Sequence, residues 1–171
     1  DGASGYLRIP SSSASGGAGL NSVLNPDHIT IEVWVKETEL RYVWWGIATK
    51  PYSDTIWTDP YVQWKIGASN LYNSSRNPLH FAVAINRTQY RIDSKTTIGD
   101  VLNKWTFIAG TFDGSIMKLY VNSVLETTYS VSGEIDKYDT DAVVGRSGIK
   151  DPNEYFPRLH SHGSHILKSV K

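Results

Sequence analysis

Residues 105–122 read WTFIAGTFDGSIMKLYVN, and this stretch decides the fold class. It reads as two strands joined at Asp113-Gly114, a residue pair typical of tight β-turns. We therefore predict a β-hairpin with strands over 105–112 and 117–121. The hairpin indicates a fold class but no activity, because a β-sheet scaffold can carry many different functions.

A second segment, residues 29–36, alternates between apolar and polar residues. Alternation in a strand sends successive side chains to opposite faces. One face takes Ile29, Ile31, Val33 and Val35, and the other takes Thr30, Glu32, Trp34 and Lys36. We expect the first of these faces to lie in the core.

Further short strands are predicted between turn residues, and no segment shows a sustained helical period. These strands are expected over 6–9, 44–49, 61–66, 79–86, 89–92, 124–131 and 142–145. Many short strands separated by turns favour an all-β fold, an antiparallel β-sandwich, over a parallel α/β fold.

The amino-acid composition narrows the range of possible functions. The 171 residues hold 17 Lys and Arg against 17 Asp and Glu, so there is no basic field for nucleic acid. The absence of cysteine excludes disulfides and thiolate chemistry, and no apolar run is long enough to span a membrane. Six Trp, ten Tyr and four Phe favour a binding surface, for which flat rings are well suited. The start at Asp1 suggests a domain processed from a larger protein.

The hairpin resembles the concanavalin A-like lectin and glucanase superfamily, in its laminin G-like jelly-roll branch. Members of that branch carry a Trp-led strand, Thr-Phe-Asp-Gly or Thr-Tyr-Asp-Gly, and then Leu-Tyr-Val-Asn-Gly. Residues 5–10, 29–36 and 143–147 are similar to three more of its elements, in the same order. The resemblance implies a jelly roll over residues 1–158. It also implies a carbohydrate-binding module, an adhesive domain or an appendage of a secreted glycan-degrading enzyme.

Two positions depart from the family pattern. Ser123 stands in place of a turn glycine, so we expect either positive φ at Asn122 alone or a wider loop. The usual closing strand is missing after Phe156, which predicts an open sheet edge and self-association through it.

Residues 159–171 form a His-rich tail that we expect to be disordered or a poor substitute for that strand. Its three histidines could bind zinc or nickel adventitiously.

The aromatic segment 44–64 is the main candidate site. Trp57 lies among loop-forming residues, where a large ring is unexpected unless a ligand covers it or it folds back over the sandwich. Trp64 should be in the core, because alternation places it opposite Tyr61 and Gln63. The residues predicted to contact a ligand are Trp57, Tyr52, Asp54, Asp59, Tyr61, Gln63 and Arg146.

An acidic segment follows at 134–141. Asp136, Asp139 and Asp141 could bind calcium, which prefers several oxygen ligands from one loop, although solvated surface carboxylates are the simpler interpretation. Glu134 and Asp136 also resemble part of the catalytic strand of related glycoside hydrolases. Hydrolysis needs two carboxylates at a defined separation, and alternation turns Asp139 away from that pair.

We therefore predict a non-catalytic, lectin-like module that binds a polysaccharide or glycan, from a secreted or cell-surface protein. A structural or adhesive domain that binds protein is the alternative, and a glycoside hydrolase ranks third.

Overall fold

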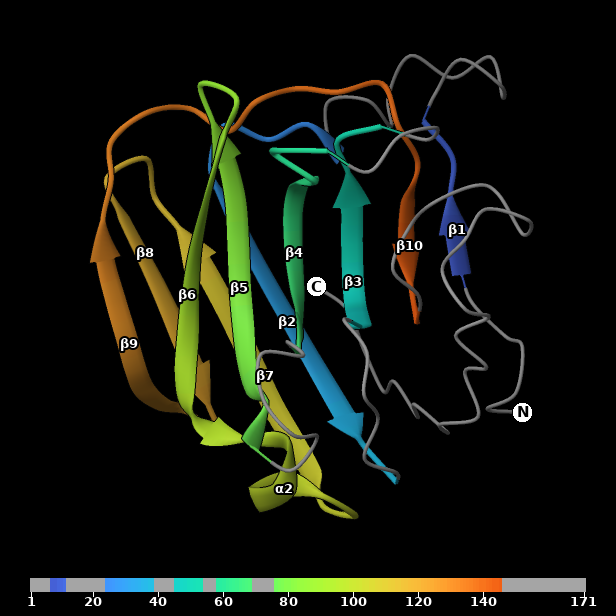
Figure 1. The fold of residues 1–171 in the computed structure, drawn as a ribbon, viewed down its shortest axis with the longest axis vertical. Helices are drawn as coiled ribbons and strands as arrows, with labels where there is room; N and C mark the ends of the chain where they lie inside the picture. The colour runs from blue at the N-terminus through green and yellow to red at the C-terminus, as the bar shows by residue number, and fades with distance from the viewer. Residues whose placement is uncertain (1–6, 12–23, 39–44, 54–57, 69–75, 146–171) are drawn as a thin grey trace.

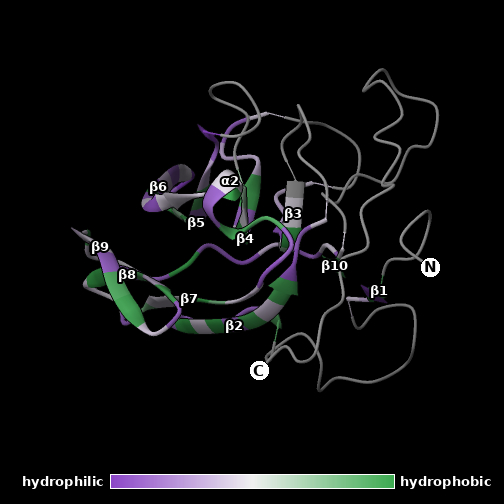
Figure 2. Ribbon diagram, turned by 90° about the horizontal axis from the view of Figure 1, so that it is seen from below, coloured by the Kyte–Doolittle hydropathy of each residue, from purple (hydrophilic) through white to green (hydrophobic). Residues whose placement is uncertain are grey.

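The computed structural model describes residues 7–11, 24–38, 45–53, 58–68 and 76–145. They form two antiparallel sheets (Figure 1). The larger sheet runs β1 (Leu7–Ile9), β10 (Ala142–Val144), β3 (Trp45–Pro51), β4 (Val62–Ala68), β5 (Pro78–Ile85) and β6 (Thr88–Thr97). The smaller sheet runs β2 (Ile29–Lys36), β7 (Trp105–Phe112), β8 (Ile116–Val121) and β9 (Val124–Ser130). The two sheets stack as layers in the view of Figure 2, so the predicted β-sandwich jelly roll is confirmed.

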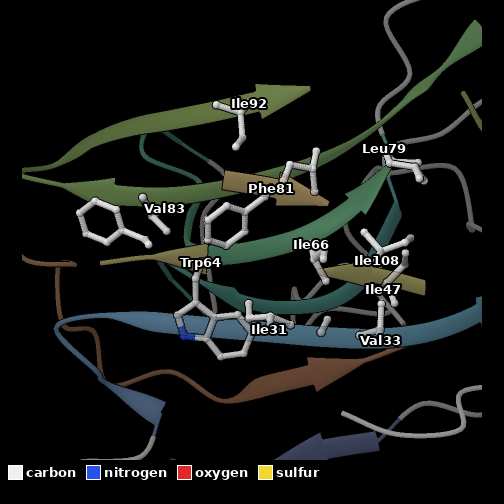
Figure 3. Packing of buried hydrophobic residues seen from close by; sticks show 14 of the residues in the cluster. Ile31, Val33, Ile47, Trp64, Ile66, Leu79, Phe81, Val83, Ile92 and Ile108 are labelled. Carbon is white, nitrogen blue, oxygen red and sulfur yellow. The ribbon is translucent and has the colours of Figure 1, made fainter. Parts of the chain in front are cut away.

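The core lies between the two sheets and follows the alternation in the sequence. On β2, Ile31, Val33 and Val35 are all buried, as predicted. From the larger sheet, Trp64 and Ile66 of β4 and Phe81 of β5 point into the same layer (Figure 3). The indole N–H of Trp64 is satisfied there, because it donates to the carbonyl oxygen of Leu24 at 3.2 Å. A buried indole without such a partner would cost free energy.

The hairpin that identifies the fold pairs β7 with β8 as predicted, and its register places Phe112 opposite Met117. The Asp113 carboxylate accepts hydrogen bonds from the backbone N–H of Ser115 and of Ile116, at 2.9 and 2.8 Å. These bonds hold the turn closed and lower the pKa of Asp113.

The next turn corrects one expectation. Asn122 and Ser123 both have positive φ, 49° and 69°, so the turn is neither wider nor strained at Asn122 alone. Two residues with positive φ match the twist of a two-residue hairpin. Ser123 therefore adopts a backbone conformation for which glycine is better suited.

One short helix was not predicted. α2 spans Ile98–Val101 and is too short to show a helical period. Its sequence signal is the Thr97-x-x-Asp100 spacing, because the Asp100 carboxylate accepts from the backbone N–H and the hydroxyl of Thr97 at 2.8 and 2.7 Å.

Side chains link the two sheets where β6 and β9 lie close together. The Glu126 carboxylate of β9 accepts hydrogen bonds from the backbone N–H of Lys95 and of Thr96, at 2.8 and 2.9 Å. The Thr127 hydroxyl donates to the carbonyl oxygen of Asp93 at 2.7 Å. Within the described ranges, β1 and β6 end the larger sheet and β2 and β9 end the smaller one. The predicted loss of the closing strand and the His-rich tail fall outside those ranges.

Candidate functional site

Three tyrosines lie at one end of the sandwich, where β3 ends, β4 begins and the chain crosses from β9 to β10 (Figure 1). Tyr52 and Tyr61 flank the connection between β3 and β4, and the backbone N–H of Tyr52 donates to the carbonyl oxygen of Tyr61 at 3.0 Å. Tyr138 belongs to the crossing segment, and its ring packs edge-on against Tyr52, with centroids 4.7 Å apart and an interplanar angle of 89°. We call these three residues the tyrosine rim.

Tyr61 has an unusual backbone conformation. Its φ is 60°, and the backbone N–H of Val62 donates across it to the carbonyl oxygen of Pro60 at 2.6 Å. Such a three-residue γ-turn with positive φ is rare and strained for a bulky side chain. The side chain is 36% exposed, so the core does not account for this strain. Strained residues concentrate at ligand-binding sites, which makes Tyr61 a candidate contact.

The Asp136 carboxylate connects the tyrosine rim to the turn between β5 and β6. It accepts hydrogen bonds from the backbone N–H of Asn86 and of Arg87, at 2.9 and 2.7 Å, and from the Tyr138 hydroxyl at 2.8 Å. Asn86 and Arg87 form the turn between β5 and β6, and both have positive φ. One carboxylate thus fixes a hairpin turn and orients a rim tyrosine.

The Tyr138 hydroxyl is held in its neutral form. Burial raises its pKa most, and the hydrogen bond to Asp136 raises it further. The neutral phenol donates its hydrogen bond to the Asp136 carboxylate.

Gln63 takes part in the fold rather than in the exposed rim. It is fully buried, and its amide nitrogen donates to the carbonyl oxygen of Leu24 at 3.3 Å. Its amide oxygen accepts from the backbone N–H of Tyr138 at 3.2 Å. Alternation places Gln63 on the side of the sheet opposite the core, but that side is covered at this point. Gln63 is therefore unsuited to direct contact with a ligand.

The other predicted contacts divide into two groups. Asp59, two residues before Tyr61, is exposed, and Tyr52 is half-buried. Trp57, Asp54 and Arg146 lie outside the described residues, so their predicted roles stay predictions. In the sequence, Trp57 and Asp54 belong to the same connection that Tyr52 and Tyr61 flank.

The acidic residues do not converge. Asp136 is occupied as described, Asp141 pairs with Arg8 and accepts from the backbone N–H of Ser11 at 2.7 Å, and Asp139 is exposed. Among the residues with described positions, no three His, Cys, Asp or Glu side chains are grouped as metal ligands would be. Calcium binding stays a prediction.

The hydrolase alternative rested on a strand at 134–139, but no strand covers these residues. Glu134 is exposed, while Asp136 is engaged by three donors. The structure provides no second carboxylate partner for Glu134 in this segment.

A second polar cluster lies on the side of the larger sheet that faces away from the core. Lys65 of β4 and Arg91 of β6 both pair with Ala82 of β5, and His80 lies two residues from Ala82. Burial lowers the pKa of Lys65 to about 7, with a smaller effect of Arg91. Burial also lowers the pKa of His80 well below its usual value, and Lys65 and Arg91 add to this. The cluster was not foreseen from the sequence.

The fold and the rim define an antiparallel jelly-roll domain with an aromatic end surface. The chain belongs to the concanavalin A-like lectin/glucanase superfamily, whose family model matches residues 1–157. Comparison with curated protein sequences finds no match. No helix among the described residues combines the length and apolar character that a membrane crossing requires.

Solved structures share the fold at low sequence identity. The CBM40 domain of Ruminococcus gnavus IT-sialidase, bound to α2,3 sialyllactose, is 14% identical with a TM-score of 0.60, over 84% of this chain and 75% of that one. A SAP-like pentraxin from Limulus polyphemus is 14% identical with a TM-score of 0.55, over 97% and 68%. Domain 4 of AbnA, an extracellular arabinanase from Geobacillus stearothermophilus in complex with arabinotriose, is 15% identical with a TM-score of 0.52, over 86% and 60%.

Proposed function

We propose that this chain is a non-catalytic carbohydrate-binding domain that binds a glycan at the tyrosine rim. The observation that carries the proposal is the exposed, strained Tyr61 beside the packed pair of Tyr52 and Tyr138. An aromatic face offers apolar contact area, and its hydroxyl group offers a polar contact, a combination suited to sugars. Asp59, two residues before Tyr61 in the chain, is exposed and offers a hydrogen-bond acceptor.

The same proposal includes three residues outside the described ranges. Trp57 would stack on the glycan, while Asp54 and Arg146 would hydrogen-bond its hydroxyl groups. The domain would act as an appendage of a secreted or cell-surface protein. Support for the carbohydrate class comes from the shared fold with sugar-bound domains, and support for the site comes from the rim itself.

Substitution of the rim tests this function. We expect Tyr61→Ala and Trp57→Ala each to weaken glycan binding at least about tenfold, which corresponds to roughly 1.4 kcal/mol. Isothermal titration with α2,3-sialyllactose and arabinotriose, followed by affinity gels of plant, algal and microbial polysaccharides, would measure the loss.

Trp34→Ala is the matched control. Trp34 is 40% exposed on β2, in the smaller sheet, and its ring packs on Phe107 with a centroid distance of 5.5 Å. Its removal should leave binding unchanged. If the wild type binds none of these sugars, or if all three variants bind equally well, the rim is not a glycan site.

Binding to another protein is the second candidate function. The exposed apolar side chains of β9 favour it. This edge strand exposes Val124, Leu125 and Tyr129 by 62%, 47% and 48%. Exposed apolar side chains on a sheet edge favour pairing with another chain. Sedimentation at increasing concentration should then show a dimer that Leu125→Lys dissociates. A wild type that stays monomeric at every concentration would exclude self-association.

A further inference from the structure

The ammonium group of Lys50 is buried beneath the tyrosine rim. Lys50 is 0% exposed, near the end of β3. Its Nζ donates to the carbonyl oxygens of Tyr138 and Thr140, both at 2.6 Å, and to the Thr140 hydroxyl at 3.2 Å. That hydroxyl donates in turn to the carbonyl oxygen of Pro51 at 2.7 Å. The ammonium thus bridges β3 and residues 138–140.

This arrangement resembles the coordination of a cation. Burying an ammonium is costly unless its N–H groups are satisfied, and these three acceptors satisfy N–H groups of Lys50. The acceptors are two carbonyl oxygens and one hydroxyl oxygen of a loop, which are also ligands that a hard cation such as Ca²⁺ uses. Lys50 therefore supplies a positive charge at a point where the loop presents oxygen atoms.

Two of the three carboxylates that suggested a calcium site already accept hydrogen bonds from groups of the protein. Two backbone N–H groups and the Tyr138 hydroxyl satisfy Asp136. Arg8 and the backbone N–H of Ser11 satisfy Asp141. A metal ion would have to compete with these donors for both side chains.

We propose that the Lys50 ammonium takes the place of a bound metal ion in this loop and thereby positions Tyr138 at the rim. Lys50 holds the carbonyl oxygen of Tyr138, Gln63 holds its backbone N–H, and Asp136 holds its hydroxyl. The ring is therefore fixed against Tyr52 without a metal. The consequence for glycan affinity rests on the function proposed above, whereas the consequence for the loop does not.

Lys50→Met is the test variant, because methionine keeps most of the side-chain length and removes the ammonium. Lys137→Met is the matched control: it removes the same charge from the residue next to Tyr138, but Lys137 is 52% exposed and pairs with Asp27 at 2.6 Å. Thr140→Val is a milder variant that removes only the hydroxyl, for use if Lys50→Met does not fold. Each protein would be melted in excess EDTA and in excess CaCl2. Amide hydrogen exchange would be followed at Tyr138 and at Thr96, which lies at the distant contact of β6 with β9.

We expect the Tm of the wild type to be the same with EDTA and with CaCl2. Lys50→Met should lower Tm by roughly 10 °C, because it leaves buried carbonyl oxygens without a donor. Exchange at Tyr138 should accelerate at least about tenfold, while exchange at Thr96 stays slow under conditions where the fold as a whole persists. Thr140→Val should show the same local pattern to a smaller extent, and Lys137→Met should show none of it.

Two results would overturn the proposal. One is a wild type that EDTA destabilises and CaCl2 restores, since the loop would then need a metal. The other is Tyr138 exchange in Lys50→Met and Thr140→Val that matches Lys137→Met, since the ammonium would then not hold the loop. If the wild type binds no glycan, the proposed function fails, but melting and exchange still decide the role of Lys50.

Discussion

Gly110→Ala is expected to destabilise the fold by about 3 kcal/mol, because the sandwich has no room for a side chain at this position. A Cβ atom on Gly110 would lie 2.5 Å from Cδ2 and 2.6 Å from Cγ of Phe81. Phe81 belongs to the opposite sheet and is fully buried in the core (Figure 3), so a shift of its ring would disturb the packing around it. Close-packed interiors tolerate added volume poorly.

Thermal and urea denaturation of the single and double variants would measure this effect. We expect the Tm of Gly110→Ala to fall by roughly 6–12 °C. Phe81→Leu alone should also destabilise the fold, but the double variant should lose less than the sum of the two, because the smaller side chain makes room for the new methyl group. Additive losses would show that Phe81 is not the obstacle.

The sequence predicted the strands and their faces well, because alternation and turn residues are local signals. The strands over 29–36 and 105–112 have the predicted bounds. Trp64 is in the core, as expected from its place opposite Tyr61 and Gln63. The short helix α2 was missed because one turn has no period, although its Thr97 and Asp100 spacing was visible in the sequence.

The site was harder to predict, because alternation tells which side of a sheet a residue faces but not what covers that side. Gln63 and Lys65 share a face turned away from the core, as predicted, yet both are buried. Periodicity therefore placed Gln63 correctly and its exposure wrongly. Exposure depends on connections between strands, whose paths a single sequence does not specify.

Tyr138 and Lys50 show a second reason why the site could not be predicted from the sequence: their partners are distant in the chain. Tyr52 and Tyr138 are 86 positions apart in the chain, and only the crossing of residues 131–141 over the end of the sandwich brings their rings together. Lys50 is an ordinary lysine near a strand end by its sequence, and such lysines are nearly always solvated. Its role depends on carbonyl oxygens of Tyr138 and Thr140, whose positions no local pattern indicates.

Acidification is expected to destabilise the protein through His80. Burial is the main cause that lowers the pKa of this imidazole well below 6.5, and the charges of Lys65 and Arg91 lower it further. In the unfolded chain His80 regains its usual pKa, so below about pH 6.5 the unfolded state binds a proton that the folded state does not bind. The free energy of unfolding should therefore fall with decreasing pH, by up to about 1.4 kcal/mol per pH unit from this one group.

The interval between about pH 6.5 and pH 5 isolates this effect. Lys65, with a pKa of about 7, is already mostly protonated in the fold there, and hydrogen bonds from Thr97 and from the backbone of Ile116 and Ser115 lower the pKa values of Asp100 and Asp113. Thermal and urea unfolding across this interval should show a shallower pH dependence for His80→Gln than for the wild type. His28→Gln, which removes an exposed histidine, controls for the loss of an imidazole elsewhere in the fold. Equal slopes for His80→Gln and the wild type would show that His80 is protonated in the folded protein, and that the polar cluster beside Lys65 and Arg91 accommodates a third positive charge.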